Sequence, residues 1–197
     1  MCGISVLFHQ QSLSSNLFDK FLVSLKKIDH RGPNDEGVIL INTKSGNYKI
    51  IRTDKTHAEV KNAVEMNDIS LSDYNLILGH KRLSIVDLSI HGHQPMQGKD
   101  GSWLVFNGEI YNYIELREEL KLLGSHFISN SDTEVLLALY ILFGKKIFDD
   151  LKGMYSFLIY DFLKDKIPIP KIIELAKPQD NLSGAILMEY IEGDLLS

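Results

Sequence analysis

The first four residues, Met1-Cys2-Gly3-Ile4, constrain this chain more than any other stretch. Cys2 is the only cysteine, and the apolar run Ile4–Phe8 that follows predicts a strand beginning at that cysteine. If an aminopeptidase removes Met1, residue 2 carries both a thiol and a free α-amine. An α-amine has an ordinary pKa of about 7.7–8.0 and a thiol one of about 8.5, so the amine could accept the thiol proton near neutral pH.

A lone cysteine is more often a small buried hydrophobic residue than a nucleophile, so Cys2 also has a purely structural interpretation.

Composition indicates a globular chain, with 44% hydrophobic and 24% charged residues. A net charge of −5 without a basic block argues against a nucleic-acid partner. A single cysteine excludes an internal disulfide framework. With no signal-peptide pattern and no apolar run of membrane-spanning length, we expect a cytoplasmic protein without membrane contact.

Apolar periodicity predicts interleaved helices and strands over residues 1–161. Helices are expected at Leu17–Asp29, Tyr113–Leu123 and Ser131–Phe143, with a further one around Ala58–Met66. Strands are expected at the other apolar runs, which are Ile4–Phe8, Val38–Ile41, Tyr48–Arg52, Leu76–His80, Ser102–Phe106 and Tyr155–Tyr160. The second and third of these strands suggest a hairpin, so the fold class is α+β with sheets covered by helices.

Two segments of the first half carry charges that could bind a ligand. The stretch from His30 to Gly37 contains two glycines and a proline, which predicts a loop, and Arg31 in it offers a forked donor suited to a carboxylate. A plain solvated turn is the alternative. Arg82 and Asp87 flank an apolar segment that could form a pocket wall with a charge at its lip, or an ordinary strand with a surface arginine.

Further candidates lie in the second half. Asn107-Gly108-Glu109 follows a predicted strand, and a sharp turn there could expose backbone N–H groups beside an amide, as in an oxyanion hole. A simple Asn-Gly turn is the alternative. Asp132 lies in a capping-box pattern, and as a lone aspartate its usual role would be the cap. The histidines at 91 and 93 lack further ligands in the pattern, so no metal site is expected.

Seven ordered segments resemble the glutaminase domain of the class II glutamine amidotransferases, most closely the asparagine synthetase branch. They are Met-Cys-Gly-Ile at 1–4, His-Arg-Gly-Pro at 30–33, Gly-His-Lys-Arg-Leu-Ser-Ile-Val-Asp-Leu at 79–88, Gly-His-Gln-Pro-Met at 92–96, Phe-Asn-Gly-Glu-Ile-Tyr-Asn at 106–112, Ser-Asp-Thr-Glu-Val at 131–135 and Gly-Met-Tyr-Ser-Phe at 153–157. The resemblance implies the N-terminal-nucleophile hydrolase fold, a four-layer αββα sandwich with two antiparallel sheets. The second sheet is expected to be incomplete, because the pattern is lost after residue 161.

The resemblance also implies a role for each matching position. Cys2 would attack the side-chain amide of glutamine with its own α-amine as base, and Asn107 with the backbone N–H of Gly108 would hold the oxyanion. Arg82 would pair with the substrate α-carboxylate, where a bidentate contact orients the ligand. The remaining implied contacts are an ammonium site at Glu109 and Asp132, a pocket wall at Leu83, Ile85 and Val86, and a glutamine-covering loop at His30, Arg31, Gly32 and Pro33. Ammonia would leave first, and water would then release glutamate from the thioester.

Residues 162–197 depart from this family and form a second predicted unit. Prolines at 168 and 170 fit an extended edge segment, and Ala185–Tyr190 predicts a buried strand. This tail resembles the hinge region of aminoglycoside phosphotransferases and related kinases. No Gly-rich loop, strand lysine or catalytic aspartate motif accompanies it, so kinase activity is not expected. A fusion, a frameshift or a truncated reading frame would explain the join.

Asparagine synthetases also carry an ATP-using domain marked by Ser-Gly-Gly-x-Asp-Ser, and this sequence contains no such loop. We therefore expect no cofactor in this chain, with ATP and magnesium belonging to a synthetase domain outside it. Glutamine is the expected ligand, and a separate synthetase domain or subunit the expected partner. The pathway would be asparagine biosynthesis, where the whole enzyme is a ligase, or amidation of a surface-sugar precursor. The alternatives are a remnant that binds glutamine or a partner without turnover, and a structural interaction domain.

Overall fold

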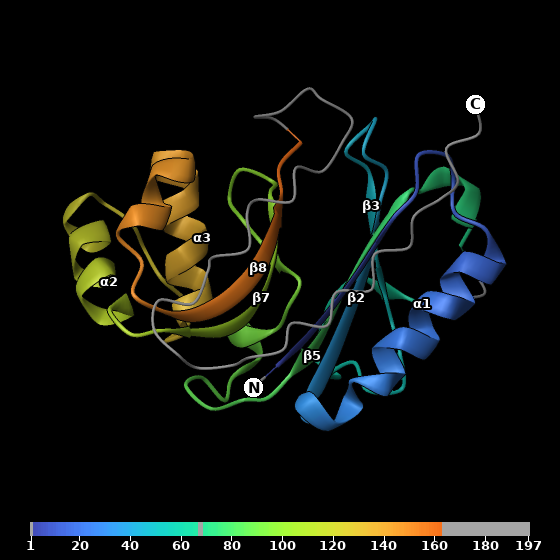
Figure 1. The fold of residues 1–197 in the computed structure, drawn as a ribbon, viewed down its shortest axis with the longest axis horizontal. Helices are drawn as coiled ribbons and strands as arrows, with labels where there is room; N and C mark the ends of the chain where they lie inside the picture. Colours follow the sequence, from blue (N-terminus) through green and yellow to red (C-terminus); the bar gives the residue numbers. More distant parts are fainter. Residues whose placement is uncertain (1, 67–68, 163–197) are drawn as a thin grey trace.

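The computed structural model describes residues 2–66 and 69–162. In this part the chain forms four layers, which Figure 1 shows edge-on. Helix α1 (Ser15–Lys27) covers a five-stranded sheet, and helices α2 (Tyr113–Leu122) and α3 (Asp132–Phe143) cover a three-stranded one. The two sheets lie between the helical layers, so the expected αββα arrangement of an α+β fold is confirmed. The predicted strand Ala185–Tyr190 and the rest of 163–197 lie outside the described residues.

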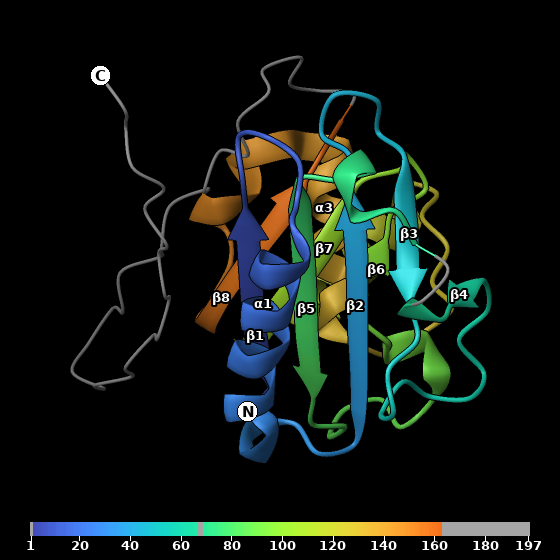
Figure 2. The ribbon, with the colours of Figure 1, turned by 90° about the vertical axis from the view of Figure 1, so that its right-hand side faces the viewer.

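The first sheet has the order β1-β5-β2-β3-β4, seen behind α1 in Figure 2. Its strands are β1 (Gly3–Phe8), β5 (Leu76–Arg82), β2 (Asp35–Ile41), β3 (Tyr48–Ile51) and the short β4 (Ala63–Val64). All its pairs are antiparallel except β3 with β4, so the expectation of a purely antiparallel sheet is wrong at this edge. Gly3 pairs with Lys81, and Asp35 pairs with Arg82. The start of β1, the end of β5 and the start of β2 therefore meet at one end of the sheet.

The second sheet contains β6 (Met96–Gln97), β7 (Trp103–Ile110) and β8 (Gly153–Tyr160), all antiparallel. The turn predicted at Asn107-Gly108-Glu109 is wrong, because these residues continue β7 and pair with β8. A Cβ at Gly108 would lie 2.3 Å from the carbonyl oxygen of Met154. The glycine thus permits a close approach between strands.

Short 3-10 turns connect these elements at Asp29–Arg31, Leu71–Asp73, Ile90–Gly92 and Gly144–Asp149. The helix predicted around Ala58–Met66 is wrong, since this stretch forms turns and then β4. Asn62 there has a φ of 60°, a left-handed conformation that ends a right-handed helix. The capping box predicted at the start of α3 is confirmed, because Ser131 accepts from the backbone N–H of Glu134, and Ser14 caps α1 in the same way by accepting from the backbone N–H of Leu17.

Three apolar clusters fill the spaces between the layers. Alternate residues of β2 face opposite sides: Val38 and Leu40 belong to the cluster beneath α1, and Ile39 and Ile41 to the one between the sheets. Burial on both faces explains why the strand is an unbroken apolar run. The third cluster joins β7 to α2 and α3. Among the described helices, none combines the length and apolar character that a membrane span requires.

Candidate active site

Cys2 lies immediately before β1, at the end of the first sheet where β5 finishes. Its Sγ accepts a hydrogen bond from the backbone N–H of Leu83 at 3.3 Å and lies 3.8 Å from the carbonyl oxygen of the same residue. The carbonyl oxygen of Cys2 accepts from Nε of Arg31 at 2.9 Å. The cysteine is thus held between the residue that follows β5 and the segment that precedes β2.

Burial raises the pKa of the Cys2 thiol above its ordinary value. The Leu83 N–H, the positive chain terminus and Arg82 partly oppose that shift, and the negative charge of Asp132 adds to it. The protonated thiol is therefore the resting form near neutral pH, so a nucleophilic role would require a base. The same influences place the charges of Arg82 and Asp132 within electrostatic reach of the sulfur.

Arg82 ends β5 and is buried, with 7% of its surface exposed. Its two terminal nitrogens donate to the carbonyl oxygens of Ser89 at 2.8 Å and Asp87 at 2.5 Å. A Cβ on Gly92 would lie 2.1 Å from one of these nitrogens, so only glycine leaves room for the guanidinium there. A guanidinium has more N–H groups than these two bonds use, so Arg82 keeps donors for a ligand. This arrangement excludes the alternative of a surface arginine.

Asp132 begins α3 and is also buried. Its carboxylate accepts from the backbone N–H of Ile110 at 3.1 Å, which ties α3 to the end of β7. Burial raises the pKa of Asp132, bonds from backbone N–H groups lower it, and the nearby charge of exposed Glu109 raises it, with a net increase. The carboxylates of Asp132 and Glu109 are close enough to interact, and together they would attract a positively charged group of a ligand.

Asn107 and Gly108 lie in β7, facing β8 residues Ser156 and Tyr155. The amide oxygen of Asn107 is buried and has no hydrogen-bond partner among the described residues. The carbonyl oxygen of Phe106, just before it, accepts from Nε2 of His80 at 3.0 Å. This bond connects β7, the strand of Asn107, to β5, which pairs with the strand that follows Cys2.

The predicted pocket wall divides into two parts. Leu83 is half-buried at Cys2, whereas Ile85 and Val86 are 71% and 44% exposed. The segment predicted to cover glutamine also contains both exposed and buried residues: His30 and Pro33 are exposed, and Gly32 is buried. Residues 29–31 form a 3-10 turn in place of a plain loop.

Sequence reasoning missed a charge network beneath this loop, in which Lys81 and Glu36 are buried and Lys55 is exposed. Lys81 forms ion pairs with Asp29 and Glu36, and Asp29 pairs also with Lys55. The hydrogen bonds from Lys55 and Lys81 lower the pKa of Asp29 to about 2. The only sequence signal was a pair of opposite charges at the polar ends of two strands, Glu36 in β2 and Lys81 in β5.

Two histidines of the loop before β6 do not form a metal centre with the described residues around them. Nδ1 of His93 lies 2.7 Å from the carboxylate of Asp35, a pairing internal to the fold. In residues 2–66 and 69–162, no three histidines, cysteines or carboxylates gather in a way that would hold a metal ion. The expectation that this chain binds no metal stays a prediction.

Two facing sheets between helical layers, with a cysteine at the start of the first strand, define the class as an N-terminal-nucleophile hydrolase fold. Residues 62–171 match the model of the glutamine amidotransferase domain family, which is more than half of the chain, and the chain belongs to that family. The matched region contains Arg82, Asn107 and Asp132, whereas Cys2 precedes it.

Individual proteins are also similar to this chain. Asparagine synthetase [glutamine-hydrolyzing] 1 of Bacillus subtilis (strain 168) is 34% identical over 164 residues, covering 82% of this chain and 21% of that protein. Amidase chyE of Penicillium rubens is 32% identical over 172 residues, covering 82% and 21% respectively. The chain thus spans about a fifth of the length of these relatives.

A solved structure shows the same fold. The glutamine phosphoribosylpyrophosphate amidotransferase of Bacillus subtilis, complexed with ADP and GMP, superposes with a TM-score of 0.60 at 22% identity. The match covers 82% of this chain and 35% of that one. This likeness concerns the fold alone, and it confirms the fold class expected from the sequence.

Proposed function

We propose that this chain hydrolyses the side-chain amide of glutamine, with Cys2 as the nucleophile. The observation that carries the proposal is the meeting of three unlike groups at one end of the sandwich. The buried guanidinium of Arg82 and the buried carboxylate of Asp132 both lie within electrostatic reach of the Cys2 thiol. A cation and an anion together suit the α-carboxylate and α-ammonium of an amino acid, and the thiol suits its amide.

Catalysis begins with loss of Met1, which leaves the α-amine of Cys2 free to accept the thiol proton. The sulfur forms a bond to the amide carbon, and the carbonyl oxygen becomes an oxyanion held by Asn107 and the backbone N–H of Gly108. The proton passes to the leaving nitrogen, and ammonia departs as the thioester forms. Water then attacks the thioester, releasing glutamate and restoring the thiol.

Substrate recognition follows from charge. Arg82 binds the α-carboxylate with the N–H groups that Asp87 and Ser89 do not use. Asp132 and Glu109 receive the α-ammonium, and the backbone of Leu83 borders the reacting carbon. Arg31, held on the Cys2 carbonyl, lets the segment from His30 to Pro33 cover the bound substrate.

The ammonia goes to a synthetase domain or subunit outside this chain. One reported relative is named a glutamine-hydrolysing asparagine synthetase, which supports asparagine synthesis as the use of the ammonia. The family resemblance implies aspartate as the acceptor and ATP with magnesium as the acceptor domain's cofactors. Such a reaction belongs in the cytoplasm. The runner-up is a glutamine-binding domain that does not turn over.

The test is glutamate release from glutamine by the purified chain, measured beside Cys2→Ala and Cys2→Ser, with intact-mass analysis of the N-terminus. We expect release by the parent with Met1 removed and a loss of at least about 1,000-fold in both variants, the scale of losing a covalent nucleophile. A folded, correctly processed parent that binds glutamine and releases no glutamate would favour the runner-up.

A further inference from the structure

We infer that Asp87 is a positioning residue that fixes the spacing between Arg82 and Asp132, the two charges that recognise the amino-acid part of the substrate. The inference rests on the proposed function and deepens it, because it names the side chain that sets the geometry of recognition. Asp87 itself does not touch the substrate.

Asp87 joins two segments that are distant in sequence. One carboxylate oxygen accepts from the backbone N–H of Ser89 at 2.7 Å, and the other accepts from the backbone N–H of Asn130 at 2.7 Å. The residue is buried, with 9% of its surface exposed. Both oxygens are therefore committed to backbone groups of the protein.

On one side, Asp87 shapes the loop that holds Arg82. The bond to Ser89 folds residues 87–89 into a tight turn, and that turn presents the carbonyl oxygens of Asp87 and Ser89 to the guanidinium. Without this turn the two carbonyl oxygens would not converge on one arginine.

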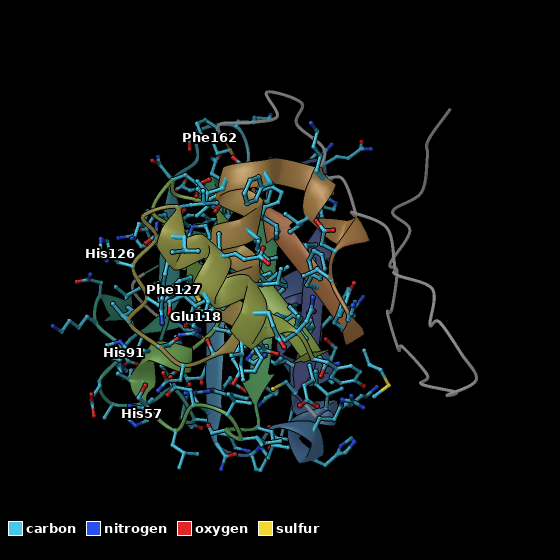
Figure 3. All side chains as sticks on the ribbon, turned by 90° about the vertical axis from the view of Figure 1, so that its left-hand side faces the viewer. His57, His91, Glu118, His126, Phe127 and Phe162 are labelled. Carbon is cyan, nitrogen blue, oxygen red and sulfur yellow. The ribbon has the colours of Figure 1, made fainter. Side chains whose placement is uncertain are left out.

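On the other side, Asp87 holds the segment that leads into α3. Asn130 stands two residues before Asp132, and Ser131 between them caps the helix. Arg117 of α2 also binds this segment, because its guanidinium donates to the carbonyl oxygens of Ser129 and Ser131 at 2.6 and 2.8 Å. Figure 3 views this side of the molecule, where Phe127 marks the segment and Glu118 marks α2.

The chemistry requires a carboxylate at this position. An ionised aspartate only accepts hydrogen bonds, whereas an asparagine would turn its NH₂ group toward one of the two backbone N–H donors. Burial raises the pKa of Asp87, but the bonds from Ser89 and Asn130 and the charge of Arg82 lower it overall, so the carboxylate is ionised at neutral pH.

The experiment compares Asp87→Asn with Asp100→Asn in the full chain. Asp100 is the matched control, since its carboxylate also accepts from a backbone N–H two residues on, at Ser102, in a turn between β6 and β7. We expect Asp87→Asn to raise the KM for glutamine about 10- to 100-fold, the equivalent of a lost charge-assisted bond, with kcat changed less than about threefold. Asp100→Asn should leave both constants near parent values.

Alkylation of Cys2 by iodoacetamide separates recognition from general damage, because this neutral reagent lacks the α-groups of glutamine. Asp87→Asn should be alkylated at the parent rate but need about 10-fold or more glutamine for protection. Equal protection in parent and variant would overturn the inference alone, and so would a kcat loss or faster alkylation without a KM change. A parent that glutamine does not protect would overturn the proposed function, and the inference with it.

A second variant covers the case in which Asp87→Asn does not fold. Ser89 has a φ of −76°, which proline adopts, so Ser89→Pro removes the N–H that donates to Asp87 and keeps the carbonyl that accepts from Arg82. It also removes the Ser89 hydroxyl, which accepts from the backbone N–H of His91, so Ser89→Ala is measured beside it. We expect a smaller KM increase for Ser89→Pro, of about three- to tenfold, in the same direction. An unchanged KM in this variant would count against the inference.

Discussion

At the scale of single residues, the pH dependence of Cys2 alkylation depends on the thiol pKa, which the neighbouring charges shift. Arg82 lowers and Asp132 raises the pKa of its thiol, so neutralising each charge should move that pKa in opposite directions. Arg82→Met should shift the pH midpoint of iodoacetamide alkylation upward, and Asp132→Asn should shift it downward. The measurement is the alkylation rate from pH 6 to 11, read by intact mass on the only cysteine.

The control for that pair is Lys121→Met, which removes an exposed charge outside the candidate site and should leave the midpoint unchanged. Shifts of the same sign in Arg82→Met and Asp132→Asn would mean that the substitutions act through structural damage and that the two charges do not flank the thiol.

Sequence reasoning singled out Cys2 as the only cysteine and Arg82 as a charge beside an apolar segment, whereas the ligand role of Asp132 came from the family resemblance, because an aspartate at a helix start is ordinary. It missed the charge network of Lys81, since the partners Glu36 and Asp29 come from other segments of the chain. Glu36 meets Lys81 through the register of β2 against β5, which no local pattern specifies. The role inferred for Asp87 was hidden for the same reason, because Asn130 lies 43 positions away in sequence.

At the scale of elements, the chain packs closely against β5 at Gly32, just after the 3-10 turn that precedes β2. A Cβ on Gly32 would lie 2.3 Å from the backbone carbon and oxygen of Lys81, which cannot move without shifting the strand. We expect Gly32→Ala to destabilise the chain by about 1–3 kcal/mol by overpacking and to lift Arg31 from the Cys2 carbonyl. Urea unfolding and faster alkylation of Cys2 would report the two effects.

Gly124→Ala is the matched substitution. Gly124 has a φ of 87° and open space around its Cβ position, so alanine there costs backbone strain alone, about 1–2 kcal/mol. Both variants should unfold at lower urea, and only Gly32→Ala should expose the thiol. Unchanged alkylation in Gly32→Ala would show that the turn does not shield Cys2.

Element predictions failed where a long-range contact overrode a local preference. Asn107-Gly108 is a favourable turn pair, yet it stays extended because β8 pairs with it along its whole length. The helix predicted around Ala58 was based on residues at helical spacing. In the structure, Asn62 adopts a left-handed conformation and the following residues form β4, which pairs with β3. Helices α1 and α3 were predicted correctly, since the apolar face of α1 and the cap of α3 are local features of the sequence.

At the scale of the whole molecule, the fully buried His80 adds a hydrogen bond between the two sheets to the apolar packing there. The layers themselves followed from the family resemblance, but the bond from His80 of β5 to Phe106 of β7 could not, because it depends on how the sheets face each other. Complete burial is the main reason that the pKa of His80 falls to about 3. The ring is therefore neutral in the folded chain at any ordinary pH.

That neutral ring gives stability a defined pH dependence. The folded-state pKa of His80 lies below its unfolded value of about 6.5, so between these values the unfolded chain takes up a proton that the folded chain does not. Stability should fall as pH drops from 6.5, with a slope approaching about 1.4 kcal/mol per pH unit near pH 5. The carboxylates with lowered pKa values, Asp29, Asp35 and Asp87, add losses that begin near pH 5 and grow at lower pH.

His80→Gln isolates this contribution, because glutamine keeps an N–H donor for the Phe106 carbonyl and does not titrate. We expect the variant to be less stable than the parent at pH 7.5 and to lose less stability between pH 6.5 and 4.5, as measured by urea unfolding. His126→Gln, at an exposed histidine, should follow the parent curve. Parallel curves for parent and His80→Gln would mean that the ring is protonated within the fold, and that the sheets are held together by a charge.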